Sequence, residues 1–183
     1  MIETLTNRTS VPKLIAPAPS SEQLEQMIQS AGRAADHGRL RPWRFIVIEG
    51  PGLDAFGELM VAAQRELQPV DDELAAKLVK KPHRAPMIVA VVCSPKEHPK
   101  VPEVEQLISA GASAQLLVSS AFALGLGAMW RSGNLMFTET MAKGLGLADH
   151  ESLVGFVYLG TPAARAPRPQ PLDSRDFVSY YRG

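Results

Sequence analysis

The sequence predicts an α+β fold, an α/β sandwich in which helices flank a sheet of about four to five strands. Helical patterns come first, short strands separated by helices follow, and an arm rich in Pro and Arg ends the chain. The 183 residues are 45% hydrophobic and 21% charged, which is ordinary for a soluble globular protein. This length predicts one domain over residues 1–183, of which residues 163–183 form the extended C-terminal arm.

The first third of the chain predicts two helices and a strand. Residues 2–7 form a short helix, and three prolines then impose an extended passage. Ser20 and Gln23 have the spacing of a capping box. They open a helix whose apolar positions recur with a helical period and which we expect to end near residue 35. Residues 43–48 are rich in β-forming side chains and predict a strand that Gly-Pro-Gly closes.

Two further helices follow, over residues 53–67 and 71–81. The first has a helical pattern, and the second has acidic residues at its start and lysines at its end, as the helix dipole favours. Residues 87–93 form a continuous apolar run of the kind found in a central strand. The inward positions expected for the first helix are Phe56, Met60, Ala63 and Leu67.

The stretch 106–130 contains no charged residue. Polar residues are spread along it, so a membrane span is disfavoured, and a helix without charge on any face is expected to be buried all round. A small domain supplies little cover for such a helix, which points to packing against a second copy of the chain. A central helix of a monomer is the alternative. Residues 128–130 and 153–159 complete the strands, with a small helix at 138–145 between them.

Composition excludes several functional classes. Lys plus Arg and Asp plus Glu each number 19, so no general field attracts nucleic acid or an anionic membrane. The start shows no secretory signal, and the single Cys93 allows no disulfide within one chain, so we expect a cytoplasmic protein. The four histidines share no ligand spacing with one another or with Cys93, and we expect no metal site. The sequence motifs typical of hydrolases and kinases are also missing.

Three polar clusters remain as candidates for a binding site. Arg8, Thr9 and Ser10 combine a cation with two hydroxyls, which suits a phosphate or a ribityl chain, although a capped helix end is the simpler alternative. Charged residues also crowd the turn at 33–41, where a solvated loop is the simpler alternative. Arg131 directly follows a buried run and must reach solvent or meet a partner such as an anionic ligand.

These clusters belong to a longer series of motifs that resembles the nitroreductase family of flavin enzymes over nearly the whole chain. The order and spacing of the motifs carry the resemblance together, and no one motif decides it. In this sequence they are Asn7-Arg8-Thr9-Ser10, Pro17-Ala-Pro-Ser-x-Glu-Gln-Leu24, Arg33-Ala-x-Asp36-His37, Pro42-Trp43-Arg-Phe45, Lys100-Val-Pro102, Ser109-Ala-Gly111, Gly127-x-x-Trp130-Arg-Ser-Gly133 and Val154-Gly-Phe-x-Tyr-Leu-Gly-Thr-Pro162.

The resemblance implies a nitroreductase-like fold with a sheet rich in antiparallel strands and the long helix at a dimer interface. It implies a homodimer that binds FMN at that interface and uses NAD(P)H to reduce a small organic acceptor of nitroaromatic, quinone or enone type. A flavin carrier without turnover, and a flavin enzyme for dehalogenation or dehydrogenation, are the alternatives. The cofactor-binding residues that it implies are Arg8, Thr9, Ser10, Arg33, His37, Trp130, Arg131 and Ser132.

Two departures from the family pattern concern charge. Thr9 stands where the family has a second Arg, which removes one cation from the expected phosphate clamp. Arg39 and Arg41 replace residues that are usually neutral and add positive charge near the expected mouth of the pocket. The second departure leads to the hypothesis of an anionic substrate.

Overall fold

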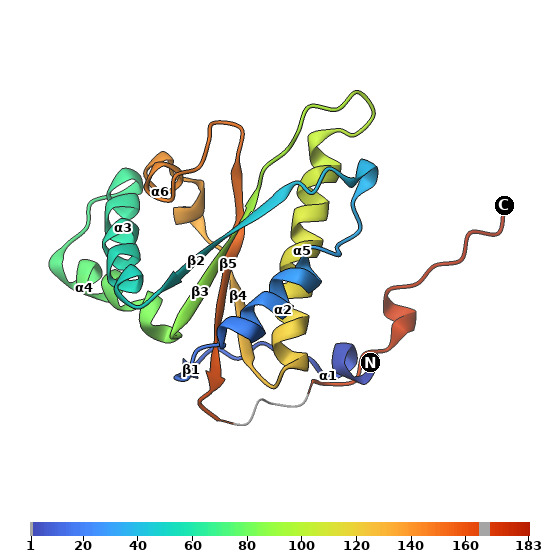
Figure 1. Cartoon of the computed structure of the whole chain (residues 1–183), viewed down its shortest axis with the longest axis horizontal. Coiled ribbons are helices and arrows are strands. Elements are labelled where there is room, and N and C mark those ends of the chain that lie inside the picture. The colour runs from blue at the N-terminus through green and yellow to red at the C-terminus, as the bar shows by residue number, and fades with distance from the viewer. Residues whose placement is uncertain (1, 165–168) are drawn as a thin grey trace.

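A sheet of five antiparallel strands forms the centre of the molecule in the computed structural model, which describes residues 2–164 and 169–183 (Figure 1). The strand order is β1-β5-β3-β2, and β4 pairs with β5 beside β1. The α+β fold with an antiparallel sheet is therefore confirmed. The strands are β1 (Leu14–Ile15), β2 (Trp43–Glu49), β3 (Met87–Cys93), β4 (Gly127–Arg131) and β5 (Ser152–Pro162).

Strand β3 lies between β5 and β2, and all seven of its residues are buried. Alternate side chains enter two separate cores, because successive residues of a strand point to opposite faces. Ile88, Ala90 and Val92 join the core on one face, whereas their neighbours Val89 and Val91 join the other. This double burial explains the continuous apolar run in the sequence.

Helices cover both faces of the sheet (Figure 1). One core is closed by α3 (Pro51–Leu67), α4 (Asp72–Lys80) and α6 (Glu139–Gly144). The other is closed by α2 (Ser21–Ala31) and α5 (Glu103–Ala123), and the short α1 (Ile2–Asn7) contacts α5. The cavity described below lies on the α3 side of the sheet.

Several local predictions are confirmed in type but differ in their ends. Ser20 and Gln23 form both hydrogen bonds of the capping box, and α2 ends at Ala31 instead of near residue 35. Pro51 opens α3 at its first turn, a position where its missing N–H costs nothing. Leu67, predicted to point inward, is 48% exposed because it is the last residue of α3.

The long helix α5 is covered on one side only within the single chain, so the burial all round that the sequence predicts through a second copy is not reached by the chain itself. Its inner stripe, which includes Ala110, Ala114 and Leu117, is fully buried. On the other side Leu107 and Ile108 are 45% and 66% exposed. Among the described residues, no helix has the length and apolar character needed to cross a membrane.

The end of the chain leaves the body of the molecule. Figure 1 shows residues 169–183 running away from the sheet, and all of them but Pro169 are exposed. The predicted arm also includes residues 165–168, which lie outside the described residues. Strand β1 was not predicted; it covers only Leu14 and Ile15, which pair with Pro162 and Thr161 of β5.

Candidate functional site

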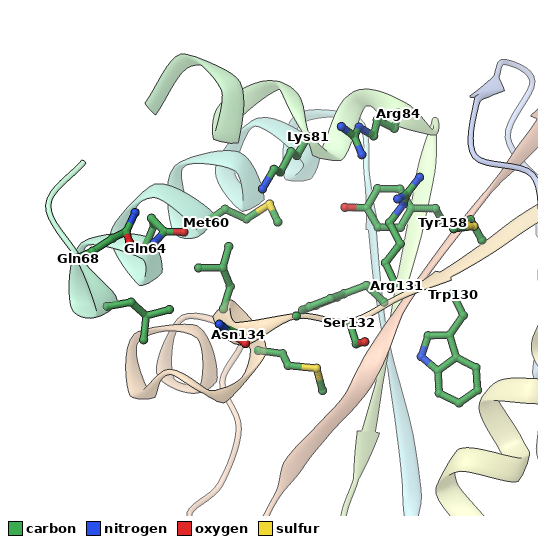
Figure 2. A pocket seen from close by; sticks show the side chains of 16 residues that line it. Met60, Gln64, Gln68, Lys81, Arg84, Trp130, Arg131, Ser132, Asn134 and Tyr158 are labelled. Atoms are coloured by element: carbon green, nitrogen blue, oxygen red, sulfur yellow. The ribbon is translucent and has the colours of Figure 1, made fainter. Parts of the chain in front are cut away.

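A cavity of about 860 Å³ opens between the end of α3 and the end of β4 (Figure 2). Its walls also include η2 (Pro82–Arg84), η3 (Asn134–Phe137) and β5. Apolar side chains of Met60, Leu135 and Phe156 form part of the lining. The remaining lining residues are Gln64, Leu67, Gln68, Lys81, Arg84, Met129, Trp130, Arg131, Ser132, Gly133, Asn134, Met136 and Tyr158.

The Arg131 side chain is fixed on the cavity wall by two contacts. Its Nη2 donates to the backbone oxygen of Pro12 at 3.1 Å, and its guanidinium carbon lies 5.2 Å from the centre of the Tyr158 ring. A cation over an aromatic face is attracted by the quadrupole of the ring. The Nε atom of Arg131 is buried and has no hydrogen-bond partner among the described residues. The guanidinium of Arg131 therefore contacts Pro12 and Tyr158, while its Nε–H can still donate a hydrogen bond.

Positive charge gathers around Tyr158 (Figure 2). Burial lowers the pKa of Arg131, and the nearby charge of Arg84 lowers this pKa further. Burial raises the pKa of the Tyr158 hydroxyl, against the opposing effect of the two arginines. Lys81 adds a third cation to the lining, and none of the described residues that line the cavity is acidic. The cavity is thus suited to an anionic ligand.

Trp130 and Arg131 point to opposite sides of β4, as successive residues of a strand must (Figure 2). The Trp130 ring packs into the core on the α5 side, next to Gly155 of β5. A Cβ atom at position 155 would lie 2.2 Å from Trp130 Nε1, so only glycine leaves room for the indole. Ser132 is exposed and lines the cavity just after the strand.

The N-terminal trio runs into a segment that lies beside β4. The Val11 amide donates to the Ala128 oxygen at 2.9 Å, and Pro12 accepts the bond from Arg131. Arg8 is half-buried, and the Thr9 Oγ1 is buried without a hydrogen-bond partner among the described residues. The structure therefore brings the trio and the residues 130–132 onto adjoining segments, although the trio does not line the cavity.

Arg33 and His37 are exposed and do not line the cavity of their own chain. His37 Nδ1 lies 2.7 Å from Glu105 Oε2 at the start of α5. Arg39 and Arg41 in the same loop have φ angles of 55° and 50°, which non-glycine residues adopt rarely. The single chain thus keeps this second group of predicted residues apart from the first.

Sequence reasoning missed two cations and one buried hydroxyl of the lining, Lys81, Arg84 and Tyr158, as well as the amides of Gln64, Gln68 and Asn134. The run Lys80-Lys81-Pro-His-Arg84, which ends two residues before β3, is the available signal, but its lysines also suit the helix dipole at the end of α4. Tyr158 gave no signal because it lies in an apolar strand. Across residues 2–164 and 169–183, no group of three or more His, Cys, Asp or Glu residues could hold a metal ion.

Comparison with known proteins places the chain in a family. The model of the Nitroreductase family matches residues 5–161. YdjA of Escherichia coli strain K12, provisionally named an NAD(P)H nitroreductase, is 37% identical over 190 residues that cover 98% of each chain. A Haemophilus influenzae protein with the same provisional name is 38% identical over 180 residues, or 96% of each chain. The chain therefore belongs to the nitroreductase family.

Solved structures agree on the fold. A nitroreductase-like protein from Bacillus cereus superposes with a TM-score of 0.83 at 20% identity, covering 100% of this chain and 96% of that one. A Desulfovibrio desulfuricans protein, provisionally named a nitroreductase and solved in complex with FMN, has a TM-score of 0.72 at 22% identity. It covers 99% of this chain and 97% of that chain. The predicted nitroreductase-like fold is confirmed.

Proposed function

We propose that this chain is an FMN-dependent oxidoreductase that uses NAD(P)H to reduce a small organic acceptor of nitroaromatic, quinone or enone type. Membership in the nitroreductase family and the NAD(P)H nitroreductase names of its relatives support an oxidoreductase. The observation that carries the proposal is the position of Arg131 on the cavity wall. This cation is partly buried, and its Nε has no hydrogen-bond partner among the described residues. None of the described residues that line the cavity is acidic.

The residues present fit FMN. The cavity falls within the range of about 300–1,000 Å³ that small-molecule sites occupy, and its lining combines apolar surface with cations. Arg8, Thr9 and Ser10 would hold the phosphate and ribityl end, and the unpartnered Thr9 hydroxyl would gain a hydrogen bond there. Arg131 and Ser132 would complete the pocket, and Trp130 would contribute through its backbone, because its ring points to the other face of β4. When bound, FMN would supply the transfer of two electrons from NAD(P)H to the acceptor.

The chain's own groups would set the electrostatics of this site. A cation beside a flavin favours the negative charge that reduction adds. Arg131 is held in place by Pro12 and Tyr158, so its positive charge stays at the wall without reorganisation. The apolar surfaces of Met60, Leu135 and Phe156 would exclude water and strengthen that interaction.

The proposal includes a homodimer with FMN at the interface. The exposed apolar residues Leu107 and Ile108 of α5, together with aromatic residues of the arm, offer surface that a second copy would cover. In the dimer, Arg33 and His37 would flank a flavin from the partner's side, since both are exposed and neither lines the cavity of its own chain. A cytoplasmic location is part of the same proposal.

An anaerobic titration tests this function. Purified protein should take up FMN with a shift in the visible spectrum, and added NADH or NADPH should then bleach the flavin. A flavin that only dithionite reduces would make the protein a carrier and would refute the enzymatic proposal. A panel of nitroaromatics, quinones and enones, each added to the reduced protein, would identify the acceptor class through reoxidation.

A further inference from the structure

We propose that Arg84 and Lys81 form an anion-recognition element at the mouth of the cavity, and that the preferred acceptors are aromatic carboxylates. This inference rests on the proposed function, because it assigns the substrate class of the same site. Both residues line the cavity from the end of α4 and from η2, and neither belongs to the residues that the sequence assigned to the cofactor.

The three cations of the lining differ in burial, and this difference separates a cofactor-binding role from a role in capturing the substrate. Arg131 lies deeper and binds Pro12 and Tyr158, so it belongs with the segments that would hold the cofactor. Arg84 is exposed and Lys81 is half-buried, so solvent and an entering ligand reach them. A cation that stays accessible at a cavity mouth attracts anions from solution and orients them on entry.

The two mouth cations have no carboxylate to neutralise them. Among the described residues, neither Arg84 nor Lys81 belongs to an ion pair, whereas pairs such as Lys77–Glu73 and Lys143–Glu139 occur on neighbouring surface. Arg84 also lies close enough to Arg131 for the two charges to repel, and an anion between them would relieve that repulsion. A guanidinium and an ammonium together match a carboxylate group.

The rest of the lining defines the other end of the ligand. Met60 and Leu67 of α3 lie along the same cavity, and the exposed Leu67 offers an apolar surface at its rim. The end of α3 carries the negative pole of the helix dipole, which disfavours an anion there. An aromatic carboxylate fits both parts of the cavity, because its carboxylate would bind Arg84 and Lys81 and its flat apolar ring would lie along α3.

A pair of probes of nearly the same shape, one anionic and one neutral, tests the inference. Fluorine NMR titration of the FMN-loaded protein with para-fluorobenzoate and with para-fluorobenzamide gives two dissociation constants. We expect the carboxylate to bind about fivefold to tenfold more tightly, which is less than a buried charge-assisted contact produces because Arg84 is exposed and solvent screens its charge. Arg84→Gln should reduce that preference to about twofold or less, the remainder coming from Lys81, without changing the affinity for the amide, and Arg84→Lys should keep most of it.

The control and the cofactor content separate the possible failures. Lys80→Gln removes a cation from α4 that does not line the cavity, and the preference should persist. Equal binding of the two probes by the parent protein, or an unchanged preference in Arg84→Gln, would overturn the inference. So would loss of FMN in Arg84→Gln, because Arg84 would then belong to the cofactor site. The parent's FMN content is measured separately, so failure of the proposed function is recognised even when the NMR result stands.

Discussion

Replacing Glu151 by Gln should destabilise the fold in a pH-dependent way, because this carboxylate joins two distant parts of the chain. Arg44 of β2 donates to it through Nε at 2.7 Å and Nη2 at 2.5 Å. The Ala148 amide donates to the same carboxylate at 3.0 Å, and Arg44 also binds the Gly146 oxygen. The pair thereby fixes the connection between α6 and β5, the strand that carries Tyr158 into the cavity.

The magnitude follows from the pKa of Glu151. The pKa of Glu151 is lowered from 4.5 to about 2, chiefly by the Arg44 hydrogen bonds and further by the Ala148 amide, against the opposing effect of burial. At about 1.36 kcal/mol per pKa unit, this lowering by about 2.5 pKa units corresponds to about 3.4 kcal/mol as an upper bound. The Glu151 side chain is 6% exposed but Arg44 is 38% exposed, so solvent screens part of the interaction and we expect about 1.5–2.5 kcal/mol.

The sign of the pH dependence is fixed by the lowered pKa. A carboxylate with a lower pKa in the folded state contributes its full stability above pH 4.5 and loses it as the pH falls toward 2. Urea unfolding of the parent and of Glu151→Gln at equal protein and FMN concentrations, at pH 7 and at pH 3, measures the change. The free-energy difference between the two proteins should be smaller at pH 3.

Glu139→Gln provides the matched control. Glu139 pairs with Lys143 on an exposed surface of α6, so its removal should change the free energy of unfolding little at either pH. A difference between the parent and Glu151→Gln that stays constant from pH 7 to pH 3 would refute the reasoning. Such a result would mean that packing around residue 151, and not its charge, supplies the stability.

Four further substitutions test the site, the strand packing and the interface. Arg8→Ala and Arg131→Ala should each weaken FMN binding about tenfold to a hundredfold in equilibrium dialysis, and unchanged affinity in both would show that the site is wrongly assigned. Gly155→Ala places a Cβ 2.2 Å from Trp130 Nε1, so the free energy of unfolding should fall by about 1–3 kcal/mol in urea titrations; an unchanged midpoint would contradict this packing. Ile108→Asp should convert a dimer into a monomer of 19.8 kDa in light scattering, and a parent protein that is already monomeric would refute the proposed interface.

The elements with strong local signals could be predicted from the sequence. The buried run of β3 and the capping box at Ser20 were recognised because burial and capping each impose a residue pattern. Strand β1 could not be recognised, because two residues pair with β5 only through tertiary contact. Which side of α5 the chain leaves exposed could not be predicted either, because Leu107 and Ile108 are apolar and a pattern of residue types does not say which apolar face the chain itself covers.

The site could be predicted only where its residues are consecutive. Arg131 was found because a cation follows a buried strand. Its partners were not found, since Pro12, Arg84 and Tyr158 come from separate elements that the fold brings together. The cationic character of the cavity is therefore a property of the tertiary structure, which the balanced net charge of the chain conceals.

The buried polar atoms without partners argue that this region is completed by a ligand. Buried polar groups in folded proteins are almost always hydrogen-bonded, since an unpaired group loses its contacts with water. In the described part of the chain, three side chains carry such an atom: Thr9, Ser113 and Arg131. Ser113 lies within α5, but Thr9 and Arg131 lie on the two adjoining segments at β4. Two of these three unpaired atoms thus lie on the segments where the proposed phosphate-bearing cofactor would supply acceptor oxygens. A neutral apolar ligand would leave both atoms without a hydrogen bond.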